Sequence, residues 1–424
     1  MKIAIMAPLV TAIREPQRGG SQAFVSDLAR GLAGRGHDVH VYAASGSEIP
    51  GVEVIDTGVD PRSLAGTLYR ASGPSAAGPA KAGTNEARAN EAGPAEEGPA
   101  EDGPAEDGAN EAGLAKAETA KAGPGEDGPG EAEAAAATGP GEDGTAAAVA
   151  AAAFAAAYAA VRAGRYDVIH NHAFDAPAVR LATALPAPVV HTLHLPPDQA
   201  VSAALRQATR RGQRPAVAAV SQFQAGAWRR VVPVDAVLPP YPPTAAIPWS
   251  AAAGRGALYA GRLSPEKGTA EAIDIARAAG VPIGVYGDVY DPGYSREQID
   301  PRRSWPGVTV HPGVPRAALW EAMAGAAVVL CPARWDEPFG MAAAEAQACG
   351  TPVVAFRRGG LGEVIMDGVT GFLVRPDDVR AAAGAVAKAA GLSRPACRKH
   401  AEGGLDLELS LDAHERLYRR VAGG

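Results

Sequence analysis

The stretch AAVVLCPARWDEPFGMAAAEAQACGTPVVAF, residues 326–356, carries the clearest fold signal in the chain. Two short apolar runs, 326–332 and 352–356, flank an alanine-rich run bounded by Gly340 and Gly350. Alanine is the best helix former and glycine commonly lies at helix ends. The pattern therefore predicts a strand, a helix and a second strand, the repeating unit of a parallel α/β sheet.

The same alternation of apolar runs and helical patterns continues in both directions. Further strands are expected at 2–8, 37–44, 166–172, 186–194, 216–221, 257–263, 282–288, 308–313 and 371–374. A chain of 424 residues is too long for one ordinary core. We therefore expect two doubly wound α/β domains, at 1–240 and 257–405, joined by a Pro-rich linker at 241–256 and followed by a last helix at 406–424.

Residues 71–145 differ in composition from the rest of the chain. Sixteen acidic and four basic residues give this segment a charge of −12, so the remainder of the chain carries +5 against a total of −7. Variants of GPAEDG recur in it with one leucine and no aromatic residue. Such a segment cannot bury enough apolar surface to fold, and we predict a disordered insertion in the first domain.

Composition also limits the classes of partner and location. The remainder has no basic run dense enough to indicate nucleic acid or a polybasic membrane anchor, so peripheral membrane contact has no support. The opening run MKIAIMAPLV favours a core strand over a signal peptide, and Ala146–Gly164 favours a helix outside the membrane over a spanning one. Three scattered cysteines without metal-like spacing predict reduced thiols and a cytoplasmic protein.

Two cations follow the first strand of the second domain, in YAGRLSPEKG, residues 259–268. Arg262 and Lys267 lie where a parallel sheet binds ligands, beyond the carboxyl end of a strand. They form a candidate clamp for a phosphate group, and the alternative is a pair of solvated surface charges.

The predicted helix after Gly340 provides a second anion site. The free N–H groups of Met341 and Ala342 should point toward a bound phosphate, and Gly340 would let it approach. Glu337 lies in the loop before this helix and Glu345 lies inside it. Their carboxylates would accept from paired hydroxyl groups, which together with the phosphate sites indicates a nucleoside diphosphate sugar. In the alternative interpretation, Glu337 caps a turn and Glu345 is solvated.

Histidines mark the strand ends of the first domain, at His170, His172, His191 and His194. The spacing of His170 and His172 could suit a metal, but no third ligand is evident, so we expect no metal site. His172 is a candidate for the acceptor side of the site.

These motifs together resemble the retaining glycosyltransferases of family 4, which have the GT-B fold of two facing Rossmann-like domains. The resemblance rests on GRLSPEKG, on EPFGMAAAE as a Glu-x7-Glu motif, on the region 349–374 and on QRGGSQAFVSDLARGLAGRGHDV near the start. It covers essentially the whole chain apart from the insertion.

The resemblance implies a role for each candidate residue. Arg262 and Lys267 would hold the donor diphosphate, Glu345 the ribose and Glu337 the donor sugar. Gly19 and Gly20 would approach the diphosphate and sugar from the first domain, with Gly19 toward the acceptor side. His194 would lie near the reacting carbon, although it could also be an ordinary strand-end histidine.

The expected activity is transfer of a sugar from a nucleoside diphosphate sugar to an acceptor, with retention and by front-face attack, without a metal or other cofactor. The sequence has no Asp-x-Asp pair to hold a metal, and the two cations can supply its charge. Two alternatives remain: a non-hydrolysing sugar-nucleotide epimerase, and a noncatalytic nucleotide-sugar-binding protein. The sugar, the base and the acceptor are not encoded in any recognisable motif.

Overall fold

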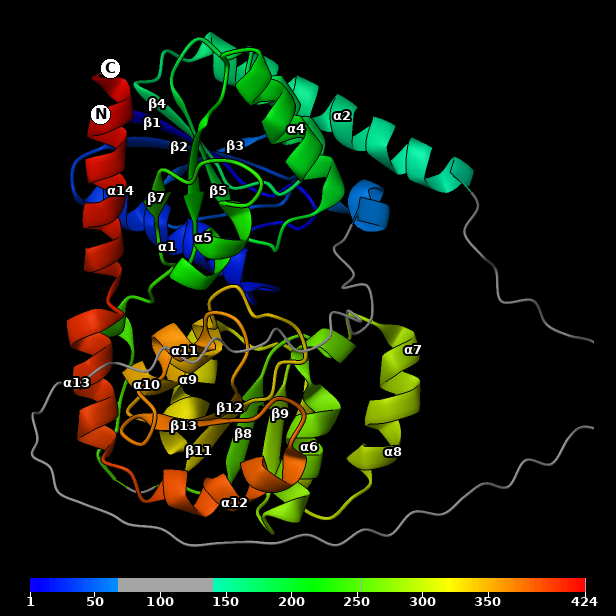
Figure 1. Cartoon of the computed structure of the whole chain (residues 1–424), viewed down its shortest axis with the longest axis vertical. Helices are drawn as coiled ribbons and strands as arrows, with labels where there is room; N and C mark the ends of the chain where they lie inside the picture. Colours follow the sequence, from blue (N-terminus) through cyan, green and yellow to red (C-terminus); the bar gives the residue numbers. More distant parts are fainter. Residues whose placement is uncertain (68–139, 253, 424) are drawn as a thin grey trace, which may run out of the picture. The chain divides into compact units, whose positions relative to one another are not determined.

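The computed structural model describes residues 1–67, 140–252 and 254–423. Within these ranges the chain forms two parallel sheets, of seven and six strands, each accompanied by helices (Figure 1). The predicted α/β class is confirmed. The segment 71–145, predicted to be disordered, lies outside the described residues as far as residue 139.

The first sheet has the strand order β3-β2-β1-β4-β5-β6-β7, and all its neighbouring strands pair in parallel. Its order reverses between β1 and β4, as in a doubly wound Rossmann sheet. The strands are β1 (Lys2–Met6), β2 (Asp38–Ala43), β3 (Glu53–Asp56), β4 (Val168–Asn171), β5 (Val189–Leu193), β6 (Ala216–Ala219) and β7 (Ala236–Val237). The helices are α1 (Gly20–Gly34), η1 (Pro61–Thr67), α2 (Pro140–Ala163), α3 (Ala176–Ala182), α4 (Gln199–Arg210) and α5 (Gln222–Trp228).

Successive side chains of β1 enter the cores on opposite faces of this sheet. Ile3 and Ile5 pack in a cluster with α1, whereas Ala4 and Met6 pack in another with α2. Side chains alternate along a strand, so a strand buried on both faces reads as a continuous apolar run. This explains why KIAIM lacks the polar alternation of a half-exposed strand.

The second sheet repeats the same topology, in the order β10-β9-β8-β11-β12-β13. Its strands are β8 (Ala257–Ala260), β9 (Ile283–Tyr286), β10 (Val308–His311), β11 (Val328–Cys331), β12 (Val353–Phe356) and β13 (Gly371–Val374). Its helices are η3 (Pro265–Lys267), α6 (Thr269–Ala278), α7 (Pro292–Tyr294), η4 (Ser295–Ile299), α8 (Asp300–Arg303), α9 (Arg316–Gly325), α10 (Met341–Ala348), α11 (Leu361–Val364), α12 (Val379–Ala390) and α13 (Arg394–Gly404). The order reverses between β8 and β11, which places a ligand-binding switch point at their carboxyl ends.

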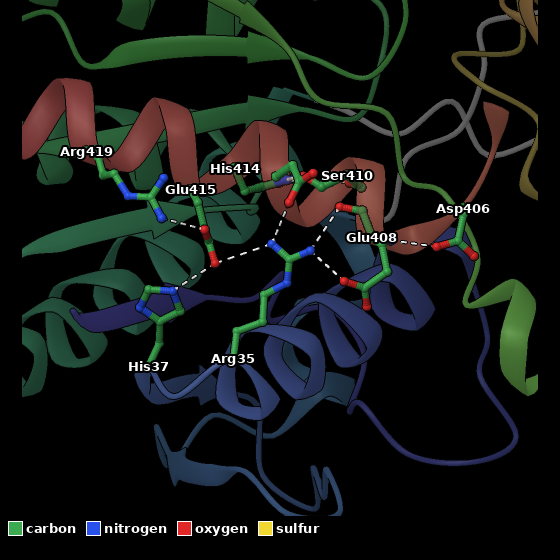
Figure 2. Close-up of polar contacts among 9 residues, drawn as sticks. Arg35, His37, Asp406, Glu408, Ser410, His414, Glu415 and Arg419 are labelled. Atoms are coloured by element: carbon green, nitrogen blue, oxygen red, sulfur yellow. Dashed lines mark hydrogen bonds and ion pairs between the residues drawn. The ribbon is translucent and has the colours of Figure 1, made fainter. Parts of the chain in front are cut away.

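The last helix, α14 (Leu407–Ala422), packs against α1 and the first sheet. Gly31 allows close approach, because a Cβ there would lie 2.7 Å from a methyl carbon of Leu411. Figure 2 shows the polar side of this contact, where the Arg35 guanidinium donates to Glu408 at 2.5 Å. The same guanidinium donates to Asp412 at 2.8 Å. Apolar packing and a charged border therefore both hold α14 in place.

One boundary differs from expectation. The helix predicted at 146–164 begins at Pro140, so residues 140–145, predicted to be disordered, are helical. Helix growth is cooperative once a nucleus exists, and the alanine run supplies that nucleus, so the helix extends into its flank. Across the described parts of the chain, no helix combines the length and apolar character needed to span a bilayer.

Candidate active site

The candidate site of the second sheet lies beyond the carboxyl ends of β8 and β11. Lys267 ends the short helix η3, and its Nζ donates to both carboxylate oxygens of Glu337, at 2.7 and 2.9 Å. The Trp335 indole N–H donates to the same carboxylate at 2.8 Å, and Lys267 also lies 4.8 Å from the centre of the Trp335 ring. A lysine 70 residues away in sequence thus fixes Glu337 in the loop before α10.

The backbone at Gly268 makes this placement of Lys267 feasible. Gly268 has φ +72°, and a Cβ there would lie 1.9 Å from the Pro332 carbonyl oxygen, which follows β11. Only glycine suits both the left-handed conformation and the close approach. The segments that follow β8 and β11 therefore pack closely at Gly268 and Pro332, and Gly268 is next in sequence to Lys267.

Arg262 follows β8 and is also paired with a carboxylate. Its Nη2 donates to Glu266 at 3.0 Å, and its guanidinium lies 4.1 Å from the centre of the Tyr290 ring. Each predicted phosphate clamp therefore has a positioning acid, Glu266 for Arg262 and Glu337 for Lys267. The alternative of freely solvated charges does not describe these side chains, whose exposed fractions are 24 % and 23 %.

Helix α10 begins as predicted. Gly340 is its N-cap residue, with φ +106°, and Ala343 and Ala344 are the first residues whose N–H groups donate to the Gly340 carbonyl. Among the described residues, the N–H groups of Met341 and Ala342 have no hydrogen-bond acceptor. These two donors are the ones expected to meet a bound anion.

Glu345 is not the solvated residue of the alternative interpretation. Its Oε1 accepts from Arg316 Nη2 at 2.8 Å, and the other end of the same guanidinium donates to Asp27 Oδ2 at 2.7 Å. Side-chain exposure is 11 % for Arg316, 4 % for Asp27 and 9 % for Glu345. Arg316 is therefore a buried cation shared by α1 and α10.

The pKa values in this cluster follow from burial and charge. Burial raises the pKa of Asp27 above its usual value, although the nearby Arg316 opposes the shift. Burial alone would lower the pKa of Arg316, but attraction by Glu345 and Asp27 outweighs it and the pKa of Arg316 is raised. Arg316 remains charged at every accessible pH.

The first sheet contributes a chain of buried histidines. His194 follows β5, and its Nε2 lies 2.9 Å from Nδ1 of His172, which follows β4. Burial, followed by the neighbouring His414, lowers the pKa of His194 to about 4, and burial holds that of His172 well below its usual value. Both rings are neutral at physiological pH.

His172 corrects one expectation. Its side chain is fully buried against His170 and Phe24, so it does not line an acceptor surface. Its strand-end position was predicted, but its direction, into the core, was not. In the described part of the chain, no group of three or more His, Cys, Asp or Glu side chains has the geometry of a metal site.

The two predicted glycines lie at the start of α1. Gly19 is the N-cap residue, and a Cβ on Gly20 would lie 2.9 Å from the Met341 sulfur. The amino-terminal ends of α1 and α10 therefore meet at Gly20 and Met341. Gly20 thus packs against the side chain of Met341, the residue that carries one of the two unpaired amides.

A pocket of about 420 Å³ adjoins the Glu337 loop. It is lined by Asp336 and Pro338 of that loop and, from the first-sheet half of the chain, by residues that include Pro196, Phe223 and Arg230. Pro196 is two residues after His194. The pocket thus lies between the sequence neighbours of both predicted catalytic residues.

Sequence reasoning missed four residues that position the site: Asp27, Glu266, Arg316 and Trp335. Glu266 lies inside GRLSPEKG and Trp335 stands two residues before Glu337, so a search for local carboxylate and indole partners could have found them. Asp27 and Arg316 are 289 residues apart, and no local pattern links them.

Two family models match the chain: "Glycosyl transferases group 1" over residues 254–402 and "Glycosyltransferase Family 4" over residues 123–240. A D-inositol 3-phosphate glycosyltransferase of Xylanimonas cellulosilytica is 52 % identical over 71 residues, which is 17 % of each chain. The aligned segment thus spans about a sixth of that relative.

Solved structures share the fold over nearly the full length. A sucrose-phosphate synthase from Thermosynechococcus elongatus gives a TM-score of 0.66 at 18 % identity, covering 99 % of each chain. The Anabaena protein HepE in complex with UDP and glucose gives 0.62 at 18 % identity, covering 98 % of this chain and 99 % of its own. From the two family matches and the two Rossmann sheets, we conclude that the chain belongs with the family 4-like glycosyltransferases of the GT-B fold.

Proposed function

We propose that the protein transfers a sugar from a nucleoside diphosphate sugar to an acceptor, with retention at the anomeric carbon and without a metal. One observation carries the proposal: Lys267, at the end of η3, is ion-paired with Glu337, which lies in the loop that leads to the two unpaired amides of α10. A cation paired with a carboxylate, next to a helix start with free amides, suits a ligand that joins a phosphate to a hydroxyl-bearing ring.

In this proposal, the diphosphate binds to Arg262, Lys267 and the N–H groups of Met341 and Ala342. Departure of the diphosphate increases its negative charge, which these fixed donors stabilise more in the transition state than before it. Glu266 and Glu337 hold the two cations in place beforehand, so little reorganisation is needed.

The two acids of the Glu-x7-Glu motif would bind the rings on either side of the diphosphate. Arg316 occupies Oε1 of Glu345, and no hydrogen bond to Oε2 is found among the described residues. That oxygen would accept from the ribose hydroxyls. Glu337 would accept from the donor sugar, with its orientation fixed by Lys267 and Trp335.

His194 and Gly20 would approach from the first sheet, with Gly19 toward the acceptor. No side chain suggests itself as a covalent nucleophile, so we infer front-face attack assisted by the leaving phosphate. The pocket beside Asp336 and Phe223 is the proposed acceptor site. A cytoplasmic location belongs to the same proposal and is compatible with the unpaired thiols of Cys331, Cys349 and Cys397.

The test begins with thermal unfolding in the presence of UDP, GDP, ADP and TDP sugars, and continues by NMR with the sugar that stabilises the protein. Because the acceptor is unidentified, slow transfer to water serves as the reaction. Release of nucleoside diphosphate with a sugar of unchanged anomeric configuration supports the proposal. Lys267→Met should weaken the response strongly, whereas Lys388→Met, an exposed change on α12, should leave it intact.

Other outcomes point to the alternatives. Formation of an epimeric nucleotide sugar without any acceptor would indicate an epimerase. Stabilisation by a nucleotide sugar that is never turned over would indicate a binding protein. Inversion of the released sugar would contradict the proposed stereochemistry.

A further inference from the structure

The hydrogen bond between the His172 and His194 rings limits where their protons can lie. The two ring nitrogens are 2.9 Å apart, so one ring donates and the other accepts. Both rings are neutral at physiological pH because burial lowers their pKa values, so the contact contains one proton. Two arrangements of that proton are available.

In the first arrangement, His172 Nδ1–H donates to His194 Nε2, and His194 carries its own proton on Nδ1. In the second, His194 Nε2–H donates to His172 Nδ1, and the His172 proton is on Nε2. The two arrangements differ at Nδ1 of His194, the ring nitrogen outside this contact. In the first arrangement Nδ1 carries an N–H donor, and in the second it carries a lone pair.

The surroundings of His172 distinguish them. His172 Nε2 is buried and has no hydrogen-bond partner among the described residues. The second arrangement would leave an N–H group orphaned there, whereas the first leaves only a ring lone pair. Orphaned buried N–H groups are the rarer defect in proteins. The first arrangement is therefore favoured.

The ring of His172 is also held in position. It packs on His170 with ring centres 4.0 Å apart and on Phe24 at 6.2 Å. His170 is itself fixed at both nitrogens, by the Tyr418 hydroxyl at 2.6 Å and the Thr192 hydroxyl at 2.7 Å. After burial, the groups that lower the pKa of His172 are the rings of His170, His194, His414 and His191. No carboxylate in this set competes for the proton.

We propose that His172 is a positioning residue that holds His194 as the neutral Nδ1–H tautomer, so that His194 presents a hydrogen-bond donor to the bound substrate. His194 is the only ring of these five that is not completely buried, with 9 % exposure. The proposal deepens the proposed function and rests on it only for the identity of the substrate. A donor at this position selects an oxygen acceptor of the donor sugar or its phosphate, and it cannot act as a base.

The tautomer is measured directly, without substrate. Long-range 1H–15N spectra of protein labelled at histidine separate a protonated ring nitrogen from one with a lone pair, and a His194→Gln variant assigns the signals. We expect Nδ1 of His194 to be protonated and Nε2 to carry the lone pair. Protonation at Nε2 in the unaltered protein overturns the proposal.

Variants at position 172 test whether His172 determines the tautomer of His194. His172→Asn places an amide N–H close to the former Nδ1 and should preserve the tautomer, whereas His172→Leu should release it. His191→Leu is the matched control, since it removes a buried histidine of β5 that has no hydrogen bond to His194. An unchanged His194 tautomer in a folded His172→Leu variant overturns the proposal.

Enzymatic turnover gives a second measurement once a nucleotide sugar that the protein uses is known. His172→Leu should lower kcat about ten-fold, the effect of losing one hydrogen bond, while His172→Asn restores it and KM changes little. If no nucleotide sugar is turned over by the unaltered protein, the proposed function fails, but the spectra still decide the tautomer. The two failures are therefore distinguishable.

Discussion

Arg316 is the residue whose replacement should have the largest effect on stability. Arg316→Met removes the guanidinium that Asp27 and Glu345 share and leaves two carboxylates, each less than 10 % exposed, without their cation. Removing one partner of a buried ion pair costs about 3–5 kcal/mol, because the remaining charge stays buried. We expect a loss of this size.

Asp27→Asn should behave differently although it breaks the same pair. The pKa of Asp27 is raised because the burial cost of its carboxylate exceeds the attraction of Arg316. An uncharged amide avoids that cost and leaves Arg316 paired with Glu345. The change in free energy of unfolding should stay within about 1 kcal/mol.

Thermal unfolding compares the two variants. One kcal/mol shifts Tm by about 2–4 °C for domains of 150–250 residues, so Arg316→Met should lower it by roughly 6–20 °C. Arg419→Met, which breaks an ion pair whose arginine side chain is 65 % exposed, is the matched control and should shift Tm little. An Arg316→Met protein that melts with the parent, or an equal loss for Asp27→Asn, would show that Arg316 does not offset the burial of these carboxylates.

Three further predictions concern pH, helix packing and the cation loop. His194 has a lowered pKa in the folded state, so the unfolded chain binds more protons below pH 6.5 and stability falls as pH drops. By pH 4 this histidine alone should lower the free energy of unfolding by about 3 kcal/mol, which urea titrations at several pH values would measure. Gly31→Val drives a side chain into Leu411 and should cost about 1–3 kcal/mol, with faster hydrogen exchange in α14 than in α12. In Gly268→Ala the new Cβ would clash with the Pro332 carbonyl oxygen, so this variant should not bind the nucleotide sugar. Gly384→Ala, in open space on α12, is the control and should bind normally. Binding by Gly268→Ala would disprove the role of this turn.

The amino-acid sequence was sufficient to predict the features that depend on local residue patterns. The alternation of apolar runs predicted both parallel sheets, and two flanking glycines predicted the extent of α10 to within two residues. The position of Lys267 and Glu337 after neighbouring strands followed from the rule that ligands bind at carboxyl ends. These inferences need only chain order and residue type.

The remaining features depend on which direction a side chain takes. His172 and His194 both end strands, but one enters the core and the other reaches its border. Arg316 finds Asp27 only because α1 and α9 are brought together by the fold. Such pairs are set by tertiary packing, which overrides any local signal.

In the proposed function, Lys267 and the start of α10 bind a pyrophosphate. Isothermal titration calorimetry with UDP, GDP, ADP and TDP tests it most directly, in the parent, in Lys267→Met and in the control Lys388→Met. We expect binding of at least one diphosphate by the parent and the control, and a loss of about 10- to 100-fold in affinity for Lys267→Met, the effect of losing a charged hydrogen bond. Equal affinity in all three proteins, or no binding of any diphosphate by the parent, would contradict it.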